Sequence, residues 1–142
     1  MTHMYFDTFI SVAPDFAGTT ARIPAPRGSA KTVAQLQYET LIDAPFTHTQ
    51  EDVLFSVWLR RQEFGDLADD EIATLRVEYF SQGRACLRAS PLTKTHGWGV
   101  VFNGQGRAAL CAIESADYHR HAANPDLEQL AAMRSKRATK AH

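Results

Sequence analysis

The stretch Gly97–Glu114, which reads G-W-G-V-V-F-N-G-Q-G-R-A-A-L-C-A-I-E, decides the fold class. Its two short apolar runs, Gly97–Asn103 and Arg107–Glu114, are separated by a turn rich in Asn and Gly. Because these residues tolerate the positive φ angles of tight turns, the pattern predicts a β-hairpin. Residues 4–13 are rich in aromatic and β-branched side chains up to Pro14, which predicts a further strand that pairs with the hairpin.

Helical patterns occupy most of the chain between these strands. Apolar side chains at helical spacing predict helices over Lys31–Asp43, Thr49–Arg61 and Ala68–Phe80. The second of them begins with T-Q-E-D, the pattern of a capping box. After the hairpin, Ser115 is expected to cap a short helix that ends near Ala123.

The C-terminal part is expected to hold one more helix. Asn124-Pro125 is a helix-start pattern, and Leu127, Leu130 and Met133 follow it at helical spacing. The predicted fold class is α+β, with a small antiparallel sheet packed against about three main helices and one or two short C-terminal helices. Residues 1–138 are expected to form a single domain and residues 139–142 a frayed tail.

Composition excludes several classes of protein. The 142 residues match the size of one domain, and a net charge of −1 gives no general attraction to nucleic acid or to anionic membranes. No apolar stretch approaches the roughly 18 residues that span a bilayer, and the N-terminus lacks the pattern of a signal peptide, so a soluble cytoplasmic protein is expected. The two cysteines, Cys86 and Cys111, lie far apart without metal-ligand spacing, so neither a metal nor a cofactor is predicted.

Signatures of established catalytic sites are absent from the sequence. It contains no G-x-S-x-G, P-loop, G-x-G-x-x-G or H-E-x-x-H. Whether the protein is an enzyme therefore stays open at this point.

The candidate site is the segment Ser90–Gly99, S-P-L-T-K-T-H-G-W-G, which we call the strip. Arg and Lys side chains near it can bind a carboxylate or phosphate, and the two glycines beside Trp98 allow a ligand or another backbone to approach its ring. The alternative is structural, with a turn at Ser90-Pro91 and a core tryptophan. The candidate ligand-binding residues are Arg88, Ser90, Lys94, Trp98 and Arg134.

Three further residues are weaker candidates. Arg84 and Arg88 flank Cys86 and would favour its thiolate, although a cysteine among apolar residues is usually a small buried side chain. His96 would act as an acid or base if a carboxylate such as Glu114 lay opposite it on the hairpin. A surface position for His96 is the alternative.

Three stretches resemble a family of small, mostly bacterial domains of unknown function. The resemblance covers almost the whole chain and implies that the basic C-terminal end belongs to the domain. It implies no ligand or reaction, and because the position of His96 is often aromatic in the family pattern, it argues against an essential acid–base role there. The stretches are V-L-F-S-V-W (Val53–Trp58), the strip together with A-I-E-S-A-D-Y (Ala112–Tyr118), and A-M-R-S-K-R-A (Ala132–Ala138).

Three hypotheses about function follow. The first is the binding of a small anionic ligand, with or without catalysis, at the strip. The second is weak contact with nucleic acid through the basic segment Met133–Lys140, which carries four cations and no acid. A winged helix-turn-helix is excluded, because its third helix would be the recognition helix and the stretch Glu63–Glu78, which covers most of that helix, is strongly acidic. The third is a protein-interaction or structural domain. The oligomeric state stays open.

Overall fold

A computed structural model describes residues 4–134 of the chain. The fold is α+β, as predicted. The strands are β1 (Thr8–Ser11), β2 (Trp98–Phe102), β3 (Ala108–Ala112) and β4 (Glu128–Ala131). The helices are α1 (Val33–Ile42), α2 (Gln50–Arg60), α3 (Asp69–Tyr79), α4 (Pro91–Thr95) and α5 (Ala116–Ala122), with a 3₁₀ turn, η1, at Leu87–Ala89.

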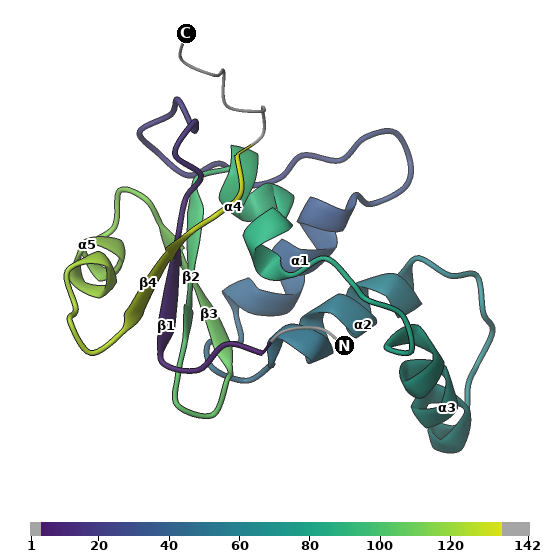
Figure 1. Ribbon diagram of the computed structural model, residues 1–142. Coiled ribbons are helices and arrows are strands. Elements are labelled where there is room, and N and C mark those ends of the chain that lie inside the picture. Colours follow the sequence, from purple (N-terminus) through teal and green to yellow (C-terminus); the bar gives the residue numbers. More distant parts are fainter. Residues whose placement is uncertain (1–3, 135–142) are drawn as a thin grey trace, which may run out of the picture.

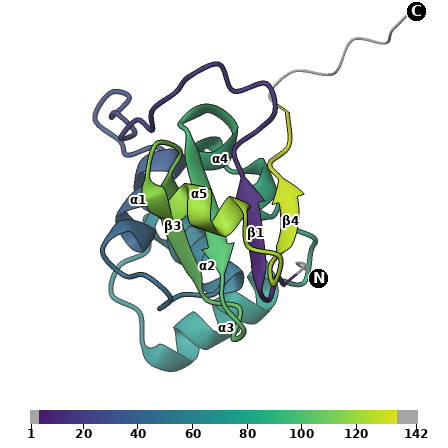
Figure 2. The same ribbon diagram turned by 90° about the vertical axis from the view of Figure 1, so that its left-hand side faces the viewer.

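The four strands form one mixed sheet in the order β3-β2-β1-β4. β2 and β3 are the predicted hairpin, and β1 pairs antiparallel with β2 so that Phe9 lies opposite Val101. β4 lies on the other side of β1 and runs parallel to it (Figure 2). The predicted pairing of the N-terminal strand with the hairpin is confirmed.

The expected last helix is wrong, because its residues form β4 instead. Asn124-Pro125 begins a turn, in which Leu127 N–H donates to the Asn124 carbonyl and the Asn124 side chain accepts from Asp126 N–H. The chain then enters the sheet, with Leu130 opposite Ile10. The same Asn-Pro pattern suits a turn or a helix start, and the free edge of β1 decides between them.

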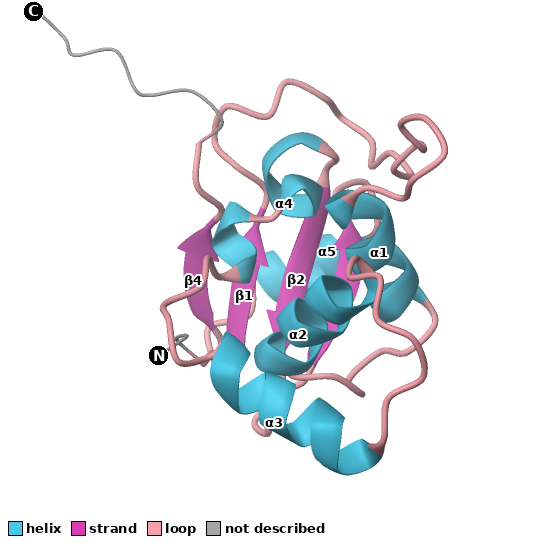
Figure 3. Ribbon diagram, turned by 90° about the vertical axis from the view of Figure 1, so that its right-hand side faces the viewer, coloured by secondary structure: helices cyan, strands magenta, loops and turns pink. Residues whose placement is uncertain are grey.

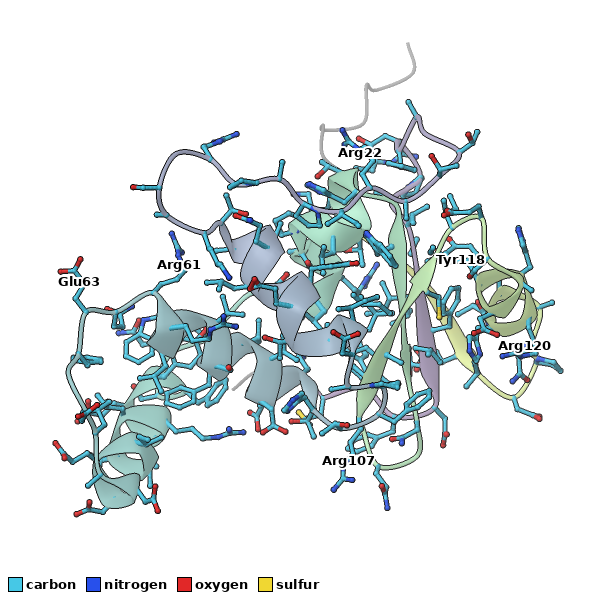
Figure 4. The ribbon with its side chains drawn as sticks, turned by 180° about the vertical axis from the view of Figure 1, so that it is seen from behind. Arg22, Arg61, Glu63, Arg107, Tyr118 and Arg120 are labelled. Atoms are coloured by element: carbon cyan, nitrogen blue, oxygen red, sulfur yellow. The ribbon has the colours of Figure 1, made fainter. Side chains whose placement is uncertain are left out.

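Helices cover both faces of the sheet. Figure 1 shows α5 on one side and α1, α2 and α4 on the other, and Figure 3 shows α2 lying across the strands. Because successive strand residues point to opposite faces, Ile10 packs with α1 and α2 whereas Phe9 packs with Tyr118 of α5. Tyr118 lies between α5 and the sheet (Figure 4), and its hydroxyl accepts from Val12 N–H at 3.0 Å.

Local capping signals set the helix starts. Thr49 and Asp52 form the predicted capping box of α2, and Thr32 with Gln35 forms one for α1. Ser115 caps α5 as predicted. None of the helices in residues 4–134 combines the length and the apolar character that crossing a membrane requires.

The loop between β1 and α1 crosses one end of the sheet and is held there by hydrogen bonds. Ala21 N–H donates to Glu114 Oε2 at 2.8 Å, and Arg22 N–H donates to the His96 carbonyl at 2.8 Å. The Arg22 guanidinium also donates to the Thr95 carbonyl. Figure 4 shows Arg22 where this loop passes α4. The loop is therefore held against the strip at Thr20, Ala21 and Arg22.

Candidate functional site

The strip folds into a capped turn, a short helix and the start of β2. Ser90 is buried, and its hydroxyl caps α4 by accepting from Leu92 N–H at 3.1 Å. Thr93 is fully buried, and its hydroxyl donates to the Leu87 carbonyl at 3.0 Å. Much of the strip therefore holds the fold together.

Trp98 is a core residue in this structure. Its indole N–H donates to the Arg22 carbonyl at 2.8 Å, and its ring centroid lies 5.3 Å from that of Tyr38. It packs with Ala34 and Leu92, and 8% of its surface is exposed. A ligand has no open ring face to stack on.

The two glycines beside Trp98 make room for protein atoms. At Gly97, whose φ is 82°, a Cβ would lie 2.9 Å from the Phe16 ring and 3.1 Å from the backbone of Ala21. At Gly99 it would lie 2.7 Å from the Tyr118 ring and 2.9 Å from Phe9. The close approach expected at this motif therefore comes from the chain itself.

The predicted cations do not gather around Trp98. Lys94 is two residues from Leu92, which packs on Trp98, and two residues on a helix diverge by about 200°. Arg88 lies toward β4, where its Nε donates to the Ala131 carbonyl and its carbonyl accepts from Met133 N–H. Arg134 is exposed just beyond this contact. The rest of the basic segment, residues 135–140, lies outside the described residues.

Cys86 and Arg84 contact residues outside the strip. Tyr5 donates its hydroxyl to Cys86 Sγ at 3.3 Å, and burial followed by this contact raises the pKa of Tyr5 to about 12. The Arg84 guanidinium stacks 4.0 Å from the centre of the Tyr79 ring. Burial also raises the pKa of Cys111 to about 11, so the Cys111 thiol is protonated at neutral pH.

His96 does not meet Glu114. The Glu114 carboxylate accepts from Ala21 N–H, whereas His96 Nδ1 lies 3.1 Å from the Pro91 carbonyl and 2.9 Å from Thr95 Oγ1. Within residues 4–134, His96 Nε2 has no hydrogen-bond partner. Through that nitrogen His96 remains available to a ligand.

His96 lines a pocket of about 490 Å³ between the β1–α1 loop, the start of α1, and α4. We call it the Arg27–His96 pocket, and its volume suits a small metabolite. The residues that line it within the described chain include no carboxylate. They are Ala25, Pro26, Arg27, Thr32, Val33, Ala34, Pro91, Thr95 and His96.

The electrostatics of this pocket favour an anion. Arg27 is exposed and forms no ion pair with a carboxylate of residues 4–134. The N–H groups of Val33 and Ala34 are the first two of α1 and have no acceptor in that part of the chain. The positive end of the α1 dipole and a guanidinium therefore act on the same space.

Two other pockets differ in charge. In one, of about 470 Å³, Lys31 and Arg60 both contact the Glu39 carboxylate, and Glu63 lies on its wall (Figure 4). The second, of about 390 Å³, is lined by Asp70 and Glu71. The first also contains Arg61, which forms no ion pair within residues 4–134, but Glu63 is part of the same lining. The second is lined by acids and by no cation. No group of three metal-ligating side chains occurs among residues 4–134.

Sequence reasoning missed the loop side of the pocket. Arg27 stands in a Pro- and Gly-rich loop, and Thr32 was not recognised as the cap of α1. The T-V-A-Q pattern at 32–35 matches a capping box and could have located this helix start. No pattern in the sequence indicates that this helix start lies close to the strip.

Fold and pocket together define a small α+β protein with a carboxylate-free pocket at a helix N-terminus. The chain belongs to the family of unknown function DUF6157, whose profile matches residues 1–138. No curated protein and no solved structure matches the chain.

Proposed function

We propose that this protein binds a small anionic molecule in the Arg27–His96 pocket. One observation carries the proposal: Arg27, which has no ion-pair partner in residues 4–134, lines the same pocket as Val33 and Ala34, whose N–H groups have no acceptor in that part of the chain. Charge-assisted hydrogen bonds from a guanidinium and from helix N–H groups are a frequent way to hold a carboxylate or phosphate.

The remaining wall suits the same ligand. His96 lines the pocket, and its Nε2 can provide a further polar contact. Thr32 and Thr95 also line it, while the Thr32 hydroxyl accepts from Gln35 N–H and the Thr95 hydroxyl donates to the Pro91 carbonyl. Pro26, Val33 and Pro91 supply apolar surface for the body of the ligand. The proposal is binding alone, because Cys86 is elsewhere and lies against Tyr5.

The test compares two cations of the same region. Isothermal titration with inorganic phosphate, acetate and their monoesters or hydroxy derivatives gives the affinity of the wild type. Arg27→Ala is expected to weaken binding roughly 10- to 100-fold, the worth of one charged hydrogen-bond donor. Lys94→Ala serves as the matched control, because it removes the same charge from α4 without touching the pocket lining.

Two results would contradict binding in the Arg27–His96 pocket. If Lys94→Ala or Arg134→Ala abolishes binding and Arg27→Ala does not, the anion binds at the cations predicted from the sequence instead. If the wild type shows neither heat nor a rise in melting temperature at millimolar ligand, the proposal is wrong, because specific binding must stabilise the folded state.

A further inference from the structure

His96 lies at the C-terminal end of α4 and lines the Arg27–His96 pocket, and one of its two ring nitrogens is already occupied. Its Nδ1 lies 3.1 Å from the Pro91 carbonyl oxygen and 2.9 Å from Thr95 Oγ1. Within residues 4–134, Nε2 forms no hydrogen bond. Nε2 is therefore the nitrogen through which the ring can meet a ligand.

The contacts of Nδ1 determine which nitrogen carries the hydrogen of the neutral ring. A carbonyl oxygen only accepts, and the Thr95 hydroxyl already donates its hydrogen to the Pro91 carbonyl at 3.0 Å. Nδ1 must then be the donor to the Pro91 carbonyl and to Thr95 Oγ1. Because a neutral imidazole has a single N–H, Nε2 of the uncharged ring is an acceptor without a hydrogen.

An acceptor at Nε2 is the wrong partner for the ligand proposed above. The oxygens of a carboxylate or a phosphate dianion are acceptors too, so two lone pairs would face each other where the anion meets Nε2. A proton between the two atoms replaces this repulsion by a charge-assisted hydrogen bond. Histidine is the side chain that takes up such a proton near neutral pH.

The charged groups around His96 leave the balancing negative charge to the ligand. Arg22 and Arg27 come from the β1–α1 loop, and Lys94 comes from α4. Glu114, which follows β3, accepts from a backbone N–H of the same loop, and the part of α1 that lines the pocket has no titratable side chain. No carboxylate of the described residues lines the pocket, so a bound anion supplies the charge that favours the imidazolium form.

We propose that the pocket binds its anion together with a proton, which is shared between His96 Nε2 and an oxygen of the anion. The inference rests on the proposed function and adds the way in which pH regulates that site. Because the complex holds more protons than the free protein and the free ligand, the affinity rises as the pH falls. The role concerns binding and requires no proton transfer in a reaction.

Isothermal titration with methyl phosphate, and separately with acetate, measures the proton directly. Tris and triethanolamine are cationic buffers with different ionisation enthalpies, so the difference in heat between them gives the number of protons taken up. Both probes carry their full negative charge above about pH 7.5. We expect the wild type to take up about one proton per ligand and to bind roughly 5- to 10-fold more weakly at pH 8.5 than at pH 7.5.

His96→Gln distinguishes this role from a structural one. The Gln amide offers an N–H donor that does not titrate, so this variant is expected to bind without proton uptake and with the same affinity at both pH values. At pH 7.5 it should bind up to roughly 10-fold more weakly than the wild type, because a neutral hydrogen bond replaces a charge-assisted one. His119→Gln is the control, since His119 is exposed on α5, on the other side of the sheet (Figure 1), and must keep the proton uptake.

The two proposals fail in different ways. A wild type that binds either probe without proton uptake overturns the role of His96 and leaves anion binding intact, as does a His96→Gln variant that still takes up the proton. A wild type that binds neither probe overturns both proposals. Should His96→Gln fail to fold or to bind, the imidazole resonances of His96 in the wild type decide, since they must report the imidazolium form when the probe is added at pH 7.5.

Discussion

At the scale of single residues, the glycines around Trp98 are explained by packing. Gly97 has a positive φ and contacts the crossing loop, and Gly99 lies against the rings of Phe9 and Tyr118. A ligand site at Gly97-Trp98-Gly99 and a tightly packed core there would both require glycine, because each needs space that a side chain would fill. Only the identity of the neighbouring atoms separates the two interpretations.

Gly99→Ala is expected to destabilise the protein by roughly 1 to 3 kcal/mol, because the added methyl group overpacks a closed core. Gly65→Ala is the control, since no heavy atom lies within 4 Å of a Cβ at that position. Urea unfolding followed by Trp fluorescence measures both. Equal stability of the two variants would show that the Gly99 neighbourhood is not tightly packed.

At the scale of elements, α2 and α3 are joined through one carboxylate. Asp52 accepts from Thr49 N–H at 2.9 Å in the capping box of α2, and its other oxygen accepts from Arg76 of α3 at 2.9 Å. Burial raises the pKa of Asp52, but the Thr49 N–H and the Arg76 guanidinium outweigh burial and hold the pKa below its ordinary value of 3.8.

The stability that Asp52 contributes depends on pH in a defined direction. Because its folded-state pKa is depressed, the contribution is fully present above about pH 4, the pKa in the unfolded chain, and is lost as the pH falls through the lower folded-state value. Asp52→Asn is expected to be less stable than the wild type by roughly 0.5 to 1 kcal/mol at pH 7. The difference should shrink toward pH 2, as followed by urea unfolding at each pH.

Glu51→Gln is the matched control for this measurement. Glu51 is also an acid in the first turn of α2, but it has no ion pair in the described part of the chain. A difference between wild type and Asp52→Asn that stayed constant from pH 7 to pH 2 would contradict the assignment.

At the scale of the whole molecule, burial is uneven. The strands β1, β2 and β3 share the main core with α1 and α2, whereas Tyr79 is the only buried residue of α3. Figures 1 and 3 show α3 at the end of the helical layer, beyond α2. Elements with few buried apolar contacts open most easily.

Hydrogen exchange is expected to separate α3 from the rest of the fold. Amides in the middle of α3 should exchange at least ~10-fold faster than those of β2, through local opening that leaves the sheet intact. Ala73→Gly, an exposed change that costs about 1 kcal/mol of helix stability, should accelerate exchange in α3 alone. Equal acceleration in β2 would mean that α3 and the sheet unfold as one unit.

The sequence alone determined the features that depend on neighbouring residues. The Asn-Gly turn with its apolar flanks specifies the hairpin, and the side chains of Thr49 and Ser115 specify helix starts because each bonds to a backbone N–H three residues on. Three residues of the strip, Pro91, Thr95 and His96, line the Arg27–His96 pocket. Closeness along the chain does not place Arg88 and Trp98 together in space, because Arg88 contacts β4 and Trp98 contacts the loop at Arg22.

Only the tertiary structure decided the rest, because it depends on contacts between distant segments. β4 is a strand because β1, over a hundred residues earlier, offers it an unpaired edge. The Arg27–His96 pocket joins Arg27 of the crossing loop to α4, and hydrogen bonds from Ala21 and Arg22 to Glu114 and His96 hold that loop over the end of the sheet. No local pattern encodes such a meeting, since its stabilising contacts form only after the sheet and the helices have packed.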